Sequence, residues 1–186
     1  MSERKAIINV ENVVASATLD QKIDLQAVLK VFQNAEYHPK QFPGLVFRLK
    51  RPKTATLIFT SGKMICTGAK SEKQAKSAIR RVVRDLRNSG IIILSQPKID
   101  IVNIVASGNL GGSIDLEEAV RVMDNVMYEP EQFPGLIHRM DDPKVVLLLF
   151  SSGKIVCTGA KNEQMIQGAM ERLSKMLKEK GLIYYK

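Results

Sequence analysis

The chain has 186 residues, of which 45% are apolar and 25% charged, and its formal net charge is +9. This composition excludes a disordered chain, and apolar runs such as Val145–Phe150 are too short to span a bilayer. The opening MSERKAI lacks the features of a signal peptide, so we expect a soluble, cytoplasmic protein with no membrane partner. The basic charge indicates a polyanionic partner, with a merely solvated basic face as the alternative.

Both halves of the chain begin with the same order of elements. A run rich in Val, Ile, Ala and Thr, typical of a β-strand, comes first, and an amphipathic helix follows it. In the first half Asp20 or Asp24 can cap a helix over residues 25–34, and in the second half Asp115 opens the equivalent helix. The expected opening strands cover residues 7–19 and 99–110.

A long block then occurs in each half. It reads QFPGLVFRLKRPKTATLIFTSGKMICTGAK over residues 41–70 and QFPGLIHRMDDPKVVLLLFSSGKIVCTGAK over residues 132–161. A shift of 91 residues aligns residues 7–95 with 98–186 without a gap, which indicates a duplicated half-domain with a pseudo-twofold axis rather than a solenoid. We therefore expect a first repeat over 1–97 and a second over 98–186, together forming one continuous domain.

The block itself indicates three strands joined by two tight turns. The first turn is predicted over residues 50–53, with 141–144 as its equivalent, because the fixed φ of proline suits one corner of a turn. If the chain folds back between residues 50 and 51, Phe42 lies across from Phe59, and Phe133 across from Phe150 in the second copy. The second turn, residues 60–62, has three residues, and this length sets which side chains of the flanking strands share a face. The shared face comprises Leu57, Phe59, Ile65 and Thr67, with Leu148, Phe150, Val156 and Thr158 as equivalents.

A second helix and a last strand are expected to complete each repeat. The helices cover residues 71–88 and 162–180 and stop at glycine, and the strands cover 91–95 and 182–185. The predicted fold class is therefore α+β, with a curved antiparallel sheet of about ten strands and four helices on one face. Cys66 and Cys157, at equivalent positions, are expected to be buried strand residues, with a disulfide or a reactive thiol as the alternative.

The predicted strands are apolar on both faces. Val145–Phe150 is apolar throughout, whereas an antiparallel sheet with one wet face normally alternates apolar and polar residues. The face without helices thus needs a covering, which can be another subunit, a lipid or an elongated ligand. Amide, hydroxyl and cationic groups recur on or near this face, and they favour the DNA minor groove, which has apolar walls, base acceptors and flanking phosphates.

At these residues the chain closely resembles the TATA-box-binding protein family, in particular its archaeal members. The motifs FPGL, LIF or LLF, SGK and CTGAK occur in both blocks, and NVVAS and NIVAS precede them, so the resemblance covers almost the whole chain. It implies a pseudo-twofold saddle whose concave sheet binds the minor groove of the A·T-rich TATA box and bends the DNA. This family is itself a standard example of such kinking.

The resemblance also assigns roles to residues. Phenylalanine pairs would wedge into base steps, polar and aliphatic side chains would contact the bases, and cations would hold phosphates. The wedges are Phe42, Phe59, Phe133 and Phe150. The base contacts are Asn12, Asn103, Thr67, Thr158, Val14, Val105, Leu57, Leu148, Ile65 and Val156. The phosphate contacts are Arg48, Arg139, Lys63 and Lys154.

The two repeats differ in charge, which predicts different partners for them. Residues 1–97 carry 17 Lys and Arg against 7 Asp and Glu, whereas residues 98–186 carry 11 against 12. By the same resemblance, transcription factor B would hold the second repeat through Glu129 and Glu131, fix the orientation on a near-symmetric site, and recruit RNA polymerase. The basic helix of the first repeat offers a surface for other partners or flanking DNA. We expect a nucleoid-associated protein.

Other interpretations stay open at this point. The phenylalanines can be core residues, the asparagines can end strands, and the rim cations can simply be solvated. A sheet that stacks single-stranded nucleic acid is a second alternative, although aromatics are only 5% of residues. A homodimer that buries the apolar face, even without DNA, is a third. An enzyme is the weakest alternative, because neither His38 nor His138 has a repeat equivalent, and no cofactor or metal is expected.

Overall fold

The structure, a computed structural model, describes residues 6–185. The chain divides into two compact units: the first unit is Asn12–Val102, and the second unit is Asn103–Lys186 together with Met1–Glu11. Strands β1 (Ile7–Thr18) and β5 (Lys98–Asn109) each contribute to both units. The α+β class is confirmed, with four helices and a large antiparallel sheet of nine strands within the described residues.

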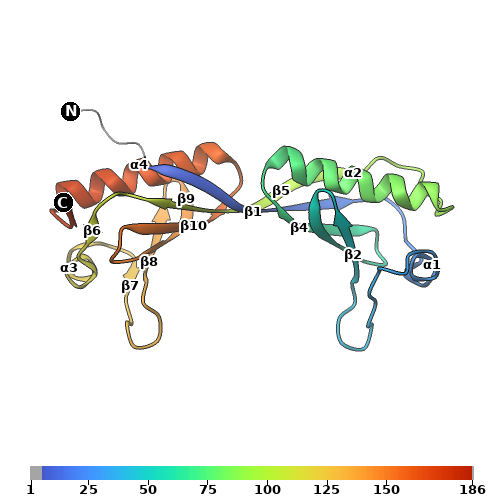
Figure 1. The fold of residues 1–186 in the computed structure, drawn as a ribbon, viewed down its shortest axis with the longest axis horizontal. Helices are drawn as coiled ribbons and strands as arrows, with labels where there is room; N and C mark the ends of the chain where they lie inside the picture. The colour runs from blue at the N-terminus through green and yellow to red at the C-terminus, as the bar shows by residue number, and fades with distance from the viewer. Residues whose placement is uncertain (1–5, 186) are drawn as a thin grey trace. The chain divides into compact units, whose positions relative to one another are not determined.

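The two units repeat one arrangement of elements. The strand order is β2-β3-β4-β1 in the first unit and β5-β10-β9-β8-β7 in the second. Each unit also has one long helix, α2 or α4 (Figure 1). The first unit contains α1 (Leu25–Val31), β2 (Leu45–Lys50), β3 (Lys53–Ile58), β4 (Lys63–Ala69) and α2 (Glu72–Asn88). The second contains β6 (Ser113–Ile114), α3 (Leu116–Val122), β7 (Val126–Met127), β8 (Leu136–Asp141), β9 (Lys144–Leu149), β10 (Lys154–Ala160), α4 (Glu163–Glu179) and β11 (Ile183–Tyr184).

The helices begin at the predicted caps. The Asp24 side chain accepts hydrogen bonds from the N–H groups of Gln26 and Ala27, at 3.1 and 3.2 Å, so Asp24 rather than Asp20 caps α1. This helix ends at Val31, earlier than predicted, because Phe32 takes an extended conformation. Its ring then packs edge-on against Phe47, with centroids 4.9 Å apart.

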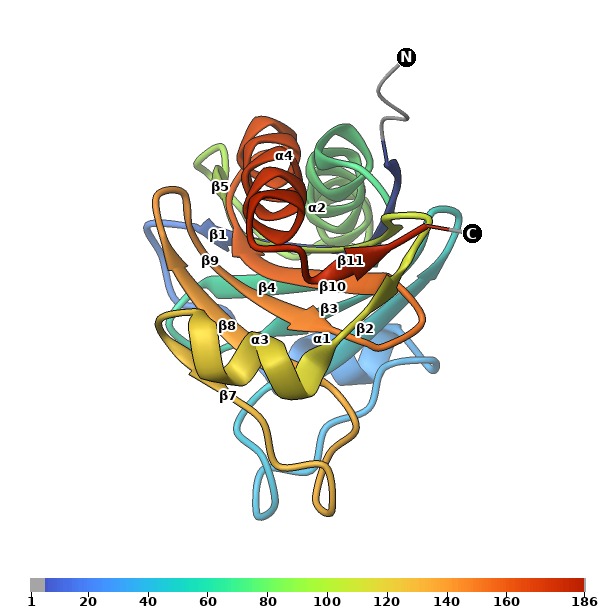
Figure 2. The same ribbon diagram turned by 90° about the vertical axis from the view of Figure 1, so that its left-hand side faces the viewer.

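One face of each unit is covered by its long helix (Figure 2). The apolar stripe of α2, from Ala75 to Leu86, is buried, and so are the strand residues of the same unit that alternate toward the core, such as Ile58 and Met64. The neighbours that alternate to the opposite face, such as Leu57 and Ile65, are only partly buried. The predicted two-sided apolar strands are therefore confirmed, and one apolar side is left accessible in each unit.

The first hairpin forms with a register different from the predicted one. Lys50 pairs with Lys53, so Arg51 and Pro52 are the turn residues, and the pairing is displaced from a fold between residues 50 and 51. The same holds in the second unit, where Asp141 pairs with Lys144. The predicted turn over residues 50–53 and its equivalent over 141–144 are therefore confirmed, and only the pairing expected from a fold between residues 50 and 51 is wrong.

The second turn matches its prediction. The Phe59 N–H donates to the Lys63 carbonyl at 2.9 Å, which leaves residues 60–62 as a three-residue loop, and Gly62 takes a φ of +92°. Leu57 then pairs with Ile65, so the predicted set of side chains shares one face.

The predicted last strands do not join the large sheet. Residues 91–95 form no strand; instead, the Gln21 side chain donates to the Ile92 carbonyl at 2.7 Å and accepts from the Leu94 N–H at 2.9 Å. In the second unit β11 pairs with β6 as a separate two-stranded sheet. Gly112, the equivalent of Gln21, explains the difference, because a Cβ there would lie 2.8 Å from the Tyr184 carbonyl oxygen. Gly112 thus leaves room for β11 to pair with β6 in the second unit. In the first unit the Gln21 side-chain amide bonds the backbone of residues 92 and 94 instead.

No helix among residues 6–185 combines the length and the apolar character needed to cross a membrane.

Candidate nucleic-acid interface

Each unit carries a pair of phenylalanine rings at one end of its accessible sheet face. The ring centroids of Phe42 and Phe59 are 5.9 Å apart with planes at 71°, and those of Phe133 and Phe150 are 5.8 Å apart at 72°. Such edge-to-face contacts are favourable for aromatic rings. Phe42 is 42% exposed and Phe133 is 38% exposed, so these rings stand at the surface rather than in the core. The rings of each pair meet as predicted, although the strand register from which the contact was predicted is not the one that forms.

The first ring of each pair comes from a loop, not from a strand. Phe42 precedes β2, and its N–H donates to the His38 carbonyl at 3.0 Å within a tight turn. This loop leaves the sheet on the side away from α2 (Figure 1). Gly44 makes the contact with Phe59 possible, because a Cβ at this position would lie 2.6 Å from Phe42 Cε1 and 3.2 Å from Phe59 Cε1. Gly135 has the same relationship to the second pair.

The floor of the accessible face follows from the strand register. Side chains that are direct cross-strand partners point to the same side of a sheet, so the pairings define rows. In the first unit one row contains Val46, Leu57, Ile65 and Ser16, and a second contains Arg48, Ala55 and Thr67. In the second unit the rows are Ile137, Leu148, Val156 and Ser107, and Arg139, Val146 and Thr158. Val14 and Val105 alternate to this same side and are partly buried.

A polar pair interrupts this apolar floor in each unit. Asn12 Nδ2 donates to Thr67 Oγ1 at 3.0 Å, and Asn103 Nδ2 donates to Thr158 Oγ1 at 3.4 Å. Asn12 and Asn103 lie inside long strands, which excludes the strand-end alternative. The structure thus brings together the amide and hydroxyl groups that the sequence placed on this face.

The predicted cations are all exposed but not equivalent. Arg48 forms an ion pair with Glu36, with Nη1 and Oε1 2.9 Å apart, and both side chains are about half exposed. Met127 occupies the position equivalent to Glu36 in the second repeat, so Arg139 lacks this carboxylate. Lys63 and Lys154 start strands β4 and β10, next to the turns that carry Phe59 and Phe150.

The loops that carry the exposed rings have opposite charge. In the second unit the Glu129 carbonyl accepts from the Phe133 N–H at 2.9 Å, so Glu129 belongs to the turn that presents the ring, and Glu131 is exposed in the same loop. The first unit has His38 and Lys40 at the equivalent positions. A charged partner protein can therefore distinguish the two units by the charge of this loop.

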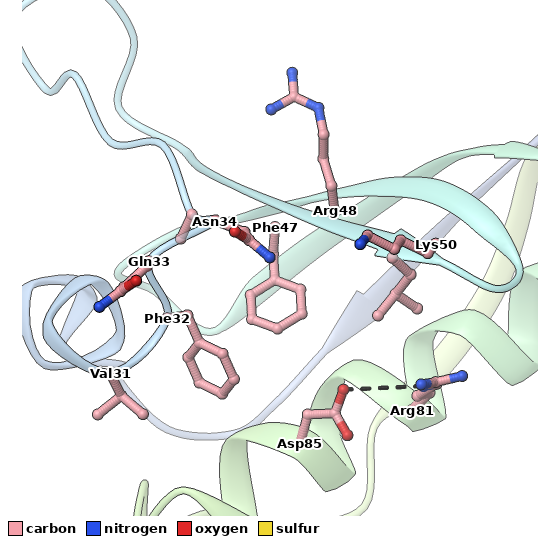
Figure 3. Close-up of a pocket in the computed structure, with 11 residues that line it drawn as sticks. Val31, Phe32, Gln33, Asn34, Phe47, Arg48, Lys50, Arg81 and Asp85 are labelled. Carbon is pink, nitrogen blue, oxygen red and sulfur yellow. Dashed lines mark ion pairs between the residues drawn. The ribbon is translucent and has the colours of Figure 1, made fainter.

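A cavity of about 580 Å³ lies on the helix side of the first unit, between α1, β2 and α2 (Figure 3). Figure 3 shows the alternation of β2: Phe47 points toward α2, whereas Arg48 points to the opposite side. The Arg81 and Asp85 side chains line the cavity as a long ion pair of 4.0 Å. The cavity thus lies behind the sheet and is not part of the accessible face.

Both cysteines and one of the two histidines are buried. Cys66 and Cys157 are fully buried and free, as predicted, and burial raises the pKa of the Cys157 thiol to about 11. A thiol with so high a pKa is a poor nucleophile. His138 is also buried, and burial lowers its pKa. Among residues 6–185 no group of His, Cys, Asp and Glu is arranged to hold a metal ion.

Comparison with known proteins identifies the family. The family model described as "Transcription factor TFIID (or TATA-binding protein, TBP)" matches residues 7–89 and again residues 98–180. The chain belongs to the TATA-binding protein family. Members of this family are DNA-binding transcription factors and not enzymes, so the chain is a transcription initiation factor that binds promoter DNA.

Archaeal relatives match over nearly the whole length. The TATA-box-binding protein of Pyrobaculum aerophilum is 50% identical over 184 residues, which is 99% of this chain and 92% of the relative. That of Methanothermobacter thermautotrophicus is 52% identical over 176 residues, 95% of this chain and 97% of the relative. The solved structure of the Methanococcus jannaschii TBP is 47% identical, with a TM-score of 0.86 over 92% of this chain and 98% of that one.

Two kinds of site residue escaped the sequence analysis. Gly44 and Gly135, which accommodate the rings, and Gly68 and Gly159, which follow the threonines, were not singled out, although both pairs recur in the two blocks. Their recurrence beside the predicted wedge and threonine positions was the available signal. The pairing of Arg48 with Glu36 was also missed, because Glu36 lies outside the repeated block.

Proposed function

We propose that this protein binds the minor groove of the A·T-rich TATA box, bends the DNA and recruits transcription factor B and RNA polymerase. The observation that carries the proposal is the accessible apolar face of each unit, ended by a surface pair of phenylalanine rings. Burial of apolar surface is favourable, so a face left open in the protein alone is suited to an apolar ligand surface. The walls of the minor groove provide such a surface.

The ring pairs would act as wedges. One pair from each unit, Phe42 with Phe59 and Phe133 with Phe150, would enter a base step at each end of the site and unstack it. Unstacking costs a few kcal/mol per step, and contacts along the bent groove offset this cost. The edge-to-face packing supports this role, because each ring is held by its partner before DNA arrives.

The floor would select A·T pairs. Leu57, Ile65, Leu148 and Val156, with Val14 and Val105, would press against the groove floor, and the asparagine and threonine groups would donate to adenine N3 and thymine O2. A guanine N2 amine pressed against these aliphatic side chains loses its hydrogen bonds to water. Each such mismatch costs on the order of 1–3 kcal/mol.

Exposed cations would hold the phosphates at the groove edges. Arg48, Arg139, Lys63 and Lys154 are all exposed, and Arg139 has no carboxylate at the position where Glu36 pairs with Arg48. Binding would therefore weaken as the salt concentration rises.

A partner that contacts one unit would orient the complex on a near-symmetric site. Glu129 and Glu131 lie in the loop that presents Phe133, where the first unit has His38 and Lys40. We assign this acidic loop to a basic surface of transcription factor B. The complex would then act on promoters within the nucleoid.

The experiment is a competition assay with three duplexes at one salt concentration. The first has an A·T-rich centre, the second has central G·C pairs, and the third has inosine·C pairs, which lack the guanine N2 amine. We expect the first and third duplexes to bind similarly and the second more weakly, and a circular-permutation assay to report a bend. Equal affinity for all three duplexes, without a bend, leaves only charge attraction and contradicts the proposal.

A further inference from the structure

The asparagine on the accessible face of each unit is held by a backbone N–H group. The Gly68 N–H donates to Asn12 Oδ1 at 2.7 Å, and the Gly159 N–H donates to Asn103 Oδ1 at 2.7 Å. Each contact lies within one unit, so the structure contains the arrangement twice. The two distances agree, whereas the contacts of the same asparagines with threonine differ, at 3.0 and 3.4 Å.

A β-bulge makes these N–H groups available. Val13 pairs with Ala69 but Ala15 pairs with Cys66, so β4 has one extra residue opposite β1, and β10 has one opposite β5. Gly68 and Gly159 occupy the bulges with φ of +99° and +95°, a conformation that other residues rarely adopt. The bulge removes the glycine N–H from the regular ladder and turns it toward the asparagine.

A backbone N–H can only donate, and this determines which way round the carboxamide lies. Thr67 Oγ1 lies 3.0 Å from Asn12 Nδ2 and 3.4 Å from Asn12 Oδ1, and a hydroxyl can donate or accept, so Thr67 does not fix the orientation. The Gly68 N–H does, because the atom 2.7 Å from it must be the oxygen, and Nδ2 is then the other end of the carboxamide. Nδ2 carries two hydrogens, and within the described chain Thr67 Oγ1 accepts one of them. The second hydrogen is available to a ligand.

We propose that the N–H groups of Gly68 and Gly159 are positioning groups that lock Asn12 and Asn103 with their amide hydrogens facing the ligand. The face then presents donors at these two points. Adenine N3 and thymine O2 are acceptors in the minor groove, whereas the guanine N2 amine is a donor and would meet a donor. The inference rests on the proposed DNA binding and adds the groups that fix the direction of its hydrogen bonds.

Cys157 allows a direct test in the full-length chain. Recombinant residues 1–156, prepared as a thioester with ¹⁵N-labelled asparagine, can be ligated to a synthetic segment 157–186 at this cysteine. Glycolic acid in place of Gly159 exchanges the amide for an ester and deletes one N–H without changing any side chain. A matched control places the ester at Glu163, whose N–H begins α4 and has no intrahelical acceptor.

In the DNA-free protein we expect the NMR order parameter of the Asn103 side-chain NH₂ group to fall in the Gly159 ester. It should stay unchanged in the Glu163 ester. Thr158→Val should leave this order unchanged, because the glycine contact sets the orientation. With DNA, the Gly159 ester should bind the A·T duplex about 3- to 10-fold more weakly, as for loss of one oriented hydrogen bond. Its preference for A·T over G·C should narrow.

A measurement on the unmodified protein guards against a misfolded ester. A scalar coupling across the hydrogen bond between the Gly159 nitrogen and the Asn103 side-chain carbonyl carbon should be detectable in uniformly labelled protein. Absence of this coupling overturns the inference, and so does a Gly159 ester with unchanged Asn103 order and unchanged A·T preference. If the unmodified protein itself shows no A·T preference, the proposed function fails, whatever the Asn103 signal shows.

Discussion

Phe42 packs edge-on against Phe59, although only Phe59 directly extends a strand of the sheet. The centroids are 5.9 Å apart, and the contact is made by a loop residue whose turn is closed by the His38 carbonyl. The position of the ring therefore depends on the loop and on Gly44, not on the hairpin register. This separates the candidate wedges from the core and makes the following variants informative.

Phe150→Ala should weaken binding to an A·T-rich duplex by at least about tenfold and leave the fold intact. The ring is only partly buried, and the variant loses an aromatic contact with Phe133 of about 0.5–1.5 kcal/mol. Duplex affinity and thermal unfolding are the measurements. Phe47→Ala is the control, since Phe47 is 5% exposed and its loss should cost about 3–5 kcal/mol of stability. Loss of cooperative unfolding in Phe150→Ala would return that residue to the core.

Gly44→Ala should displace the Phe42 ring without changing the strands. The new Cβ would lie 2.6 Å from Phe42 Cε1, and an exposed ring can move away where a core residue cannot. We expect weaker DNA binding and less bending in the circular-permutation assay, with little change in the unfolding midpoint. Unchanged bending would show that Gly44 does not place the wedge.

Gly168→Ala should change the stability of the protein and leave its DNA binding unchanged, the reverse of Gly44→Ala. Gly168 lies inside α4, and beyond its chain neighbours and the backbone of its own helix no described atom lies within 4 Å of the place that a Cβ would take; alanine is the better helix former. The free energy of unfolding should rise by about 0.5–1 kcal/mol, measured by denaturant titration, while duplex affinity stays the same. A fall in stability would contradict the open environment of this glycine.

His138 should make the protein less stable in acid. Burial lowers the pKa of the imidazole below its ordinary value of 6.5, the nearby carbonyls of Asn125 and Asp124 and the Asp141 carboxylate oppose this, and Arg172 adds to it. The folded state thus disfavours the charged form. The stability that comes from burying the neutral imidazole is fully present above the pKa of this histidine in the unfolded chain, which is about 6.5. It decreases as the pH falls below that value.

Denaturant titrations at pH 7.5 and pH 5.5 should show this loss. His138→Phe, which installs the residue found at the equivalent position 47, should reduce the loss. An identical pH dependence in this variant would assign the effect to other groups.

Glu131→Lys should weaken binding of transcription factor B to the DNA complex and leave DNA binding unchanged. The side chain is exposed in the loop that presents Phe133, and reversal of its charge opposes a basic partner. A supershift titration with transcription factor B measures this. Lys40→Glu makes the reverse change at the equivalent position of the first unit, and equal effects of the two variants would contradict an oriented partner.

Features set by neighbouring residues were predictable from the sequence, and those set by distant ones were not. The caps at Asp24 and Asp115 and the three-residue turns depend on a few adjacent residues, so they were predicted correctly. The Asn12 contact with Gly68 links residues 56 positions apart and depends on a β-bulge. No pattern of adjacent residues in the sequence indicates it.

The wrong last strand has the same origin. Residues 91–95 have the composition of a strand, but whether they pair depends on residue 21, which is glutamine where the second repeat has Gly112. A duplicated sequence predicts two similar halves and cannot show where a single exchange changes their hydrogen bonding.

The two buried cysteines give each unit an internal reporter. Cys66 and Cys157 are inaccessible in the folded state, one in each unit, so a thiol reagent can reach either only after that unit opens. Single-cysteine variants labelled side by side would give separate opening rates for the two halves. Equal rates would mean that the duplicated halves unfold as one cooperative whole, and unequal rates that they have diverged in kinetic stability as well as in charge.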